Sequence, residues 1–388
     1  MRRLFRILGF LLIQLVLGLA LLALALEPAI RFIQPQALLM RGKESFFPGD
    51  PDLQFAIRPG AETVLARKGF SITVRSNALG FRDPDRGAKG EAIRILALGD
   101  SFTFGWGVEQ DQTFEHQMEV IEAGARAARG GGPPLEVINA GVPGYNLYQS
   151  VLALEKKGWA VDPDIVLMDA FVQNDFSENV STEEWIEAKR SGTKPKKEEG
   201  ALSVWLETNS QAYVWLKVKY LSSYRMRRTW YKLTRPFKHK PRESKIQYRN
   251  LLAFQVPPPE EMVREWALAE QLLLRLRDDV GARGKRLVVV LLPPELQVMP
   301  DRWKNDSNKL DLGTARFDVE APNRRVAAYC EREGIAVLDL LPAFREAAAR
   351  GGDLYFPSDH HWTAAGHRLA AELILADLHA RGWLAGEH

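Results

Sequence analysis

The stretch Ile93–Ser101, which reads IRILALGDS, decides the fold of this 388-residue chain. Its first six residues form a short apolar run that is typical of a buried strand, and Gly99 and Asp100 then indicate a sharp turn. A serine just after a parallel strand points out of the carboxyl edge of the sheet, where open α/β sheets bind their ligands. We therefore expect Ser101 to lie in a functional site.

Strand and helix patterns alternate after this point. Four more strands are predicted, at 135–139, 164–172, 287–292 and 336–340. Helices are predicted between and after them, at 114–129, 145–159, 261–282, 320–333 and 363–381. This alternation predicts the α/β class: a three-layer α/β/α fold with a five-stranded, mainly parallel sheet of the flavodoxin-like kind, joined by right-handed crossovers.

The chain divides into three parts. Residues 1–35 form an N-terminal segment, and 36–90 form a lead-in rich in proline, glycine and turn signals, with one strand expected at 70–74. Residues 91–385 form the α/β domain, which carries an insertion at about 177–260.

The N-terminal segment has the pattern of a membrane signal. Three arginines within the first six residues precede 8–26, which contains one strongly polar side chain, Gln14. As a helix this run spans roughly 28 Å, close to the thickness of the hydrocarbon core. Its flanking charge places the rest of the chain outside the cytoplasm. A retained anchor is the favoured interpretation. A signal peptide cleaved after Ala23-Leu24-Ala25 and a buried core helix remain as alternatives.

Charge is concentrated in the insertion. The whole chain carries a net charge of +3, yet residues 181–250 contain 17 Lys and Arg against 7 Asp and Glu, interleaved with Trp and Tyr. A solvated cap, a surface resting on anionic lipid headgroups and a groove for an acidic or carbohydrate substrate all fit this pattern. Export argues against nucleic acid as its partner.

Cys330 is the only cysteine of the chain, which excludes an intrachain disulfide.

Three further blocks fall where they can meet Ser101. The runs 139–145 and 173–175 follow predicted strands, and 359–362 (Asp-His-His-Trp) opens the last helix. The carboxyl ends of parallel strands share one edge of a sheet, so these blocks can converge. A histidine held by a carboxylate can deprotonate a serine, which is otherwise too weak a nucleophile. The pattern therefore predicts covalent acyl chemistry.

At these residues the chain resembles the SGNH (GDSL-type) hydrolase superfamily, over 93–175 and 285–380. The resemblance implies that Ser101 is the nucleophile. It also implies an oxyanion hole made by the backbone N–H groups of Ser101 and Gly144 and the side chain of Asn174. Gly144 is preferred to Gly141 by its distance from the start of its block.

The last block departs from the usual Asp-x-x-His spacing of that superfamily. Its Asp-x-His-Trp form is similar to the branch that contains alginate O-acetyltransferase-like proteins. His361 is preferred to His360 as the base because Gly366 follows five residues later, and Asp359 would orient it.

Other polar and aromatic residues of these blocks have structural interpretations. Asp100 and Asp175 are expected to brace loops, and His367 to be structural. Trp106 and Tyr145 are expected to be wall residues.

The sequence thus predicts an exported, membrane-anchored serine esterase or deacetylase that acts on ester-linked acyl groups, with carbohydrate as the carrier. An O-acyltransferase that acetylates an extracellular polysaccharide and a non-catalytic glycan-binding or assembly protein remain as alternatives. The expected partners are an ester-bearing small molecule or acylated glycan and, through the N-terminal helix, a membrane. No cofactor and no metal are expected. A metal phosphoesterase would need further Asp and His clusters at the strand ends.

Overall fold

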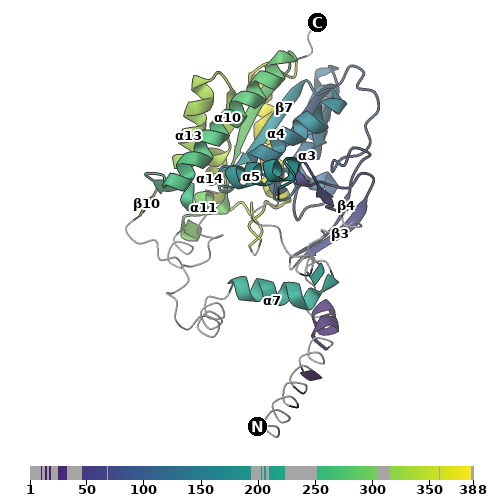
Figure 1. Cartoon of the computed structure of the whole chain (residues 1–388). Coiled ribbons are helices and arrows are strands. Elements are labelled where there is room, and N and C mark those ends of the chain that lie inside the picture. The colour runs from purple at the N-terminus through teal and green to yellow at the C-terminus, as the bar shows by residue number, and fades with distance from the viewer. Residues whose placement is uncertain are drawn as a thin grey trace.

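A computed structural model gives the architecture of the chain (Figure 1). It describes residues 10, 14, 17, 18, 25–32, 46–67, 69–193, 202, 205, 206, 209–222, 251–303, 315–357 and 359–385.

A five-stranded sheet forms the centre of the molecule. Its strands are β5 (Ile93–Leu98), β6 (Leu135–Asn139), β7 (Ile165–Phe171), β9 (Arg286–Leu292) and β11 (Ala336–Asp339). They lie in the order β11-β9-β7-β5-β6, and every neighbouring pair is parallel. The prediction of a five-stranded parallel α/β sheet is therefore confirmed, and the order is that of the flavodoxin-like folds.

Helices cover both faces of this sheet. On the face toward the viewer in Figure 1 lie α4 (Leu147–Lys156), α10 (Glu260–Ala282) and α13 (Ala321–Arg332). On the other face lie α3 (Phe114–Arg129), α14 (Leu341–Ala349) and α15 (Ala364–Ala380). The side chains of β5 alternate between these two layers: Leu96 and Leu98 pack on the first, Ile95 and Ala97 on the second. Because it is buried on both sides, β5 reads as a continuous apolar run.

The structure adds short elements that periodicity did not predict. They are α2 (Ser101–Phe104), α11 (Glu295–Val298), the 3-10 helices η1 (Gln110–Gln112) and η2 (Gly158–Val161), and the antiparallel pair of β8 (Gln255–Val256) and β10 (Arg316–Phe317). The helix expected at 145–159 also ends earlier, at Lys156, and η2 continues it. Helix α14 was missed because it follows β11 after a single residue and left no loop signal.

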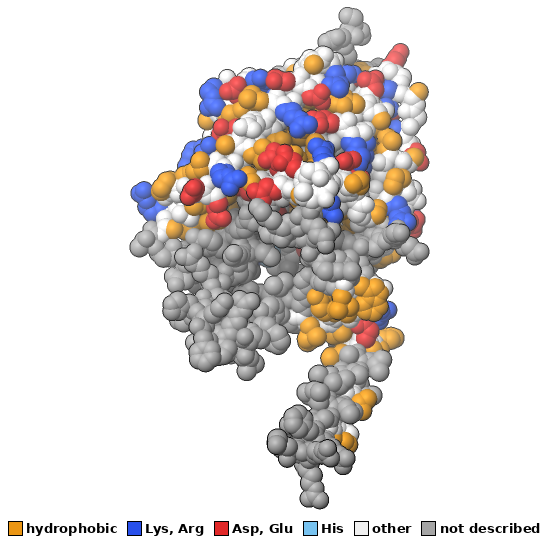
Figure 2. Space-filling model, viewed as in Figure 1, with side chains coloured by type: hydrophobic (Ala, Val, Ile, Leu, Met, Phe, Trp, Pro, Cys, Tyr) orange, Lys and Arg blue, Asp and Glu red, His pale blue; other side chains and the backbone are white. Residues whose placement is uncertain are grey.

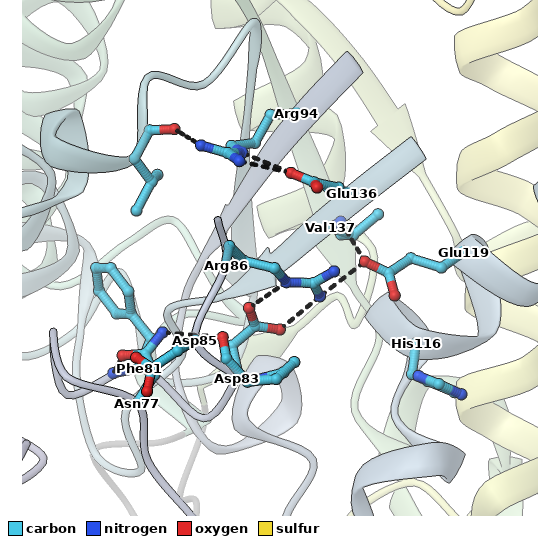
Figure 3. A network of polar contacts seen from close by, with 12 residues as sticks. Asn77, Phe81, Asp83, Asp85, Arg86, Arg94, His116, Glu119, Glu136 and Val137 are labelled. Carbon is cyan, nitrogen blue, oxygen red and sulfur yellow. Dashed lines mark hydrogen bonds and ion pairs between the residues drawn. The ribbon is translucent and has the colours of Figure 1, made fainter. Parts of the chain in front are cut away.

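The lead-in packs against the domain rather than leading away from it. Its short strands are β1 (Gly49–Asp50) and β2 (Gln54–Phe55), and its hairpin consists of β3 (Glu62–Arg67) and β4 (Phe70–Arg75). Figure 3 shows Arg86 between Asp83 and Glu119 of α3, at 2.7 and 2.8 Å. The same Glu119 carboxylate accepts a hydrogen bond from the backbone N–H of Val137. This contact covers a backbone donor of the edge strand β6.

A buried arginine of the lead-in braces the segment after Ser101. The Arg82 side chain is fully buried, and its guanidinium donates hydrogen bonds at 2.6–2.7 Å to the carbonyls of Phe104, Gly105 and Val108. Burial lowers the pKa of Arg82 to about 10. The lead-in is thus part of the scaffold that holds the turn of Ser101.

The insertion begins with α5 (Asn179–Arg190) and includes α7 (Gln211–Ser222), while Trp230, Tyr224 and Tyr231 lie outside the described residues. Most of the apolar run 8–26 also lies outside them, although its described positions are helical. Within the described ranges we find no helix whose length and apolarity would suffice for a membrane crossing.

Candidate active site

Ser101 stands where β5 ends and α2 begins. Asp100 forms the N-cap of α2, and its carboxylate accepts a hydrogen bond from the N–H of Phe102 at 2.8 Å. Gly99 allows the tight approach of β5 to α2, because a Cβ atom there would lie 2.2 Å from the hydroxyl of Thr103. The turn therefore holds the serine hydroxyl at the carboxyl edge of the sheet.

The structure brings Ser101, His361 and Asp359 together. The Ser101 Oγ lies 2.7 Å from the Nε2 of His361. The Nδ1 of the same ring is hydrogen-bonded to a carboxylate oxygen of Asp359. The side chain of Asp359 is 8% exposed and that of His361 is 21% exposed, so the imidazole reaches the surface while its carboxylate is covered. This arrangement can move a proton from serine to histidine and stabilise the imidazolium that forms.

A tight turn accounts for the two-residue spacing of Asp359 and His361. The carbonyl of Phe356 accepts hydrogen bonds from the N–H groups of Asp359 and His360, and the N–H of Phe356 donates to the carbonyl of His361. The chain reverses at His360, whose φ is +70°. This left-handed conformation is uncommon for a residue with a side chain. The turn, closed by the backbone of Phe356, thus holds the side chains of Asp359 and His361 close to each other.

His360 is anchored outside the Ser101–His361–Asp359 chain of hydrogen bonds. Its Nδ1 lies 2.6 Å from the carboxylate of Glu295, and its ring lies 2.7 Å from the guanidinium of Arg302. Arg302 and Glu295 also form an ion pair at 2.9 Å. Because only two residues separate Glu295, the first residue of α11, from the end of β9, these contacts tie the turn of His361 to the sheet.

The two other expected oxyanion donors follow the strands on either side of β5. Asn174 follows β7 and Gly144 follows β6, and β5 lies between these strands. The run after β6 continues along the turn of Ser101, where the N–H of Val142 donates to the carbonyl of Gly99 at 3.1 Å. In this sheet order the switch point falls between β5 and β7, where open α/β sheets bind ligands. Ser101 and Asn174 follow these two strands.

The two glycines of the block after β6 differ in role. The N–H of Gly141 donates to the side chain of Asn139 at 3.1 Å, and a Cβ at Gly141 would lie 2.3 Å from the backbone N of Phe104. Gly144 is exposed, has φ +86° and meets only the ring of Phe55, 3.6 Å from where its Cβ would be. Gly141 is thus used in packing, whereas Gly144 lies at the surface.

Buried carboxyl groups lie beneath the turn of Ser101. Asp100, Asp169 and Asp175 are all nearly fully buried. Burial raises the pKa of Asp100 to about 6 and that of Asp169 to about 8, and it also raises the pKa of Asp175. Asp169 accepts a hydrogen bond from the hydroxyl of Thr103 in α2, and Asp175 accepts one from the N–H of Phe171 in β7. These carboxyls brace the loops, as expected of Asp100 and Asp175.

Aromatic rings surround His361. The rings of Phe102 and Trp106 lie 4.9 and 6.2 Å from its imidazole. Phe70 of the lead-in hairpin packs on Trp106 and on Phe356. The sequence placed Phe70 only in an expected strand and Arg82 only in a lead-in rich in turn signals, and it did not single out Phe356.

Residues expected to be structural are buried. His367 accepts a hydrogen bond from the N–H of Phe114 at the start of α3, and burial lowers its pKa to about 3. Tyr145 is buried and donates to the carbonyl of Phe55, and Cys330 is buried too.

Among the residues that the structure describes, no group of three His, Cys, Asp or Glu side chains is placed to hold a metal ion.

One family profile matches the chain. Residues 258–387 match the SGNH hydrolase-like domain of the acetyltransferase AlgX, over about a third of the chain. This part runs from α10 to α15 and contains Asp359 and His361 but not Ser101. The resemblance to SGNH hydrolases is thereby confirmed. A search of curated proteins finds no match.

Several solved structures are similar to this chain at low identity. A putative lipolytic protein of the G-D-S-L family from Desulfitobacterium hafniense DCB-2 is 11% identical, with 73% of this chain and 97% of that chain covered and a TM-score of 0.37. An acetyl xylan esterase from Geobacillus stearothermophilus is 12% identical, with 74% and 95% covered and a TM-score of 0.41. A lipase/acylhydrolase from Enterococcus faecalis is 14% identical, with 76% and 98% covered and a TM-score of 0.37. These scores are too low to carry an argument about function.

The structure joins a flavodoxin-like sheet to a hydrogen-bonded Ser101, His361 and Asp359, which is the arrangement of an enzyme that acts on ester bonds. Over residues 258–387 the chain is similar to the SGNH type of such enzymes.

The conformation of His360 yields a first prediction. Asparagine tolerates the left-handed region, whereas a β-branched residue there is a strong outlier. We expect His360→Asn to keep kcat/KM for p-nitrophenyl acetate within about tenfold of the wild type, and His360→Val to lower it well below that range, because about 1–2 kcal/mol of backbone strain would move His361. Equal rates for the two variants would contradict this role of the turn.

The burial of Asp169 yields a second prediction. Burial raises its pKa from the ordinary 3.8 to about 8, so the folded protein favours the protonated acid. This contribution to stability is complete below the unfolded pKa and is lost as pH rises through the folded pKa. Thermal unfolding should therefore show that the stability of Asp169→Asn relative to the wild type is greater at pH 9 than at pH 5, by on the order of 1 kcal/mol or more. The exposed Asp353→Asn serves as the control. The same difference in stability between variant and wild type at pH 5 and at pH 9 would contradict a raised pKa of Asp169 in the fold.

Proposed function

We propose that Ser101 takes up a short acyl group, acetyl in the first place, and passes it to a hydroxyl group of a carbohydrate. The observation that carries the proposal is the unbroken chain of hydrogen bonds from Ser101 through His361 to Asp359. The family profile supports acetyl as the acyl group and transfer as the reaction, because it describes an acetyltransferase.

In the first half of the reaction, the Ser101 Oγ attacks the carbonyl carbon of the donor ester and its proton moves to the Nε2 of His361. The Asp359 carboxylate stabilises the imidazolium. The negative charge on the carbonyl oxygen is met by the N–H groups of Ser101 and Gly144 and the side-chain amide of Asn174. One such donor typically contributes a factor of about 10²–10³ in rate. The donor alcohol leaves with the proton of His361, and an acyl-serine remains.

The second half repeats these steps in reverse. The acceptor hydroxyl gives its proton to the Nε2 of His361 and attacks the acyl carbonyl. The bond to the Ser101 Oγ then breaks, and the serine recovers its proton from the imidazolium. Each half therefore breaks one ester bond and balances one proton, and no further reactant is needed.

Hydrolysis is the second candidate function. Ser101 is half-buried, and 21% of the His361 side chain is exposed, so a water molecule can take the place of the acceptor hydroxyl. The same acyl-serine would then release free acid, which is the activity of an esterase or deacetylase. A non-catalytic glycan-binding or assembly role leaves the hydrogen bond between Ser101 and His361 without an explanation.

The compartment is part of the proposal. We infer an extracytoplasmic domain tethered by the N-terminal segment, in the periplasm or at the cell surface. The apolar run 8–26 and the three arginines before it support this location. An ester-bearing glycan outside the cytoplasm would then be within reach.

The decisive assay follows the fate of the acyl group. The full chain is given p-nitrophenyl acetate together with a panel of oligosaccharides, and free acetate and acetylated sugar are measured side by side. We expect acetylated sugar with the wild type and with the exposed control Ser191→Ala. Ser101→Ala should show neither product, because it lacks the nucleophile.

Two outcomes would change this assignment. Free acetate as the only product, at every sugar concentration, would replace transfer by hydrolysis. Turnover by Ser101→Ala equal to that of the wild type would contradict covalent catalysis by Ser101 altogether.

A further inference from the structure

The insertion helix α7 (Gln211–Ser222) begins beside the helical residues 25–32. In Figure 1 its first turn meets these residues, and the rest of α7 runs away from them. Helix α11, which follows the carboxyl end of β9, and the hairpin of β3 and β4 lie on the same side of the domain as α7. The end of α15 and the C-terminus lie on the opposite side. The sheet edge that carries Ser101 therefore faces α7.

Glu27 joins the two helices. Its carboxylate accepts hydrogen bonds from the hydroxyl of Ser210 and from the N–H groups of Gln211 and Ala212, at 2.8, 2.9 and 3.0 Å. Arg31, one turn further along, donates to the same carboxylate at 3.0 Å. These bonds outweigh desolvation, which acts in the opposite direction, and lower the pKa of Glu27 to about 2. The carboxylate thus stays charged and caps the first turn of α7.

Large apolar side chains are exposed around this junction. Phe32 is 91% exposed, Leu202 69%, Trp205 59% and Leu216 of α7 44%. Figure 2 shows hydrophobic side chains gathered beside the N-terminal segment, apart from the mixed charges that cover the sheet domain. Exposed apolar side chains gathered in one place mark contact with another apolar phase or partner.

The composition of the sequence from α7 onward indicates that a lipid membrane contacts these exposed apolar side chains. Residues 211–250 contain 12 Lys and Arg and a single acidic residue, Glu243. Basic residues mixed with Trp and Tyr are typical of segments at the headgroup level of anionic membranes. The apolar run 8–26 leads directly into the helical residues 25–32, so the junction lies where that run ends. A lipid surface explains the exposed apolar side chains and this continuity, and the basic composition of 211–250 is of the kind that anionic headgroups attract.

We propose that α7, together with Leu202 and Trp205, lies in the headgroup layer of an anionic bilayer, held against the helical residues 25–32 by Glu27. The sheet edge with Ser101 then faces the membrane surface, and its substrates reach it along that surface. The proposal concerns lipid contact and not the acyl chemistry, so it can fail while the proposed function stands.

The test places a fluorophore on this surface. The buried Cys330 is first changed to alanine, and one new cysteine is introduced by Leu202→Cys or Leu216→Cys and labelled with NBD. Val263→Cys, at an exposed position of α10, is the matched control. The full chain is reconstituted in phosphatidylglycerol–phosphatidylcholine vesicles that carry a nitroxide on the headgroup. We expect quenching of at least about half of the emission at 202 and 216 and little at 263, because nitroxides quench only on close approach.

Two results would overturn the proposal. Quenching at 202 and 216 no stronger than at 263 would show that lipid does not cover α7. Quenching at 216 that Glu27→Gln leaves unchanged would remove Glu27 from its role, since the neutral amide caps a helix less well than a carboxylate. Glu62→Gln, in an exposed ion pair, is the control substitution. Hydrolysis of a soluble ester, measured on the same samples, reports separately on the catalytic site.

Discussion

The hydrogen bond between Ser101 and His361 is the interaction on which the rest of the structure depends. It joins residues 260 positions apart at 2.7 Å. Only the parallel sheet makes this possible, because it places β5 among the central strands and presents the turn after it to the last helix. Two bracing contacts help to keep Ser101 and His361 at this distance. Arg82 binds carbonyls of the segment after Ser101, and Glu295 binds His360 in the turn beside His361.

The contacts that hold the turn of Ser101 include buried carboxyl groups, which destabilise the fold when they ionise. Asp100, Asp169 and Asp175 lie within the same interior, where an ionised carboxyl is poorly solvated. Their raised pKa values show that the fold favours the protonated acids. A protein interior usually keeps such groups only when they are hydrogen-bonded, and Asp169 and Asp175 brace α2 and the end of β7 in this way. The site is thus rigid at the expense of stability toward high pH.

The sequence was sufficient for the sheet and for the residues that meet at its edge, because buried parallel strands are continuous apolar runs and the turns after them are short. It could not reveal Arg82 or Phe70, whose partners lie on separate elements and leave no periodic signal. Helix α14 was hidden by its direct junction with β11. The left-handed turn at His360 was equally hidden, because histidine does not predict that conformation. Long-range contacts and backbone strain are products of tertiary packing.

The central claim is that His361 and Asp359 activate Ser101. The most direct measurement is the rate at which a fluorophosphonate modifies the chain, followed by intact mass and by peptide mapping of the adduct. The account predicts a single adduct on the peptide that contains Ser101, with a rate that falls by at least about a hundredfold in His361→Ala. Modification at another residue, or an undiminished rate in His361→Ala, would contradict it.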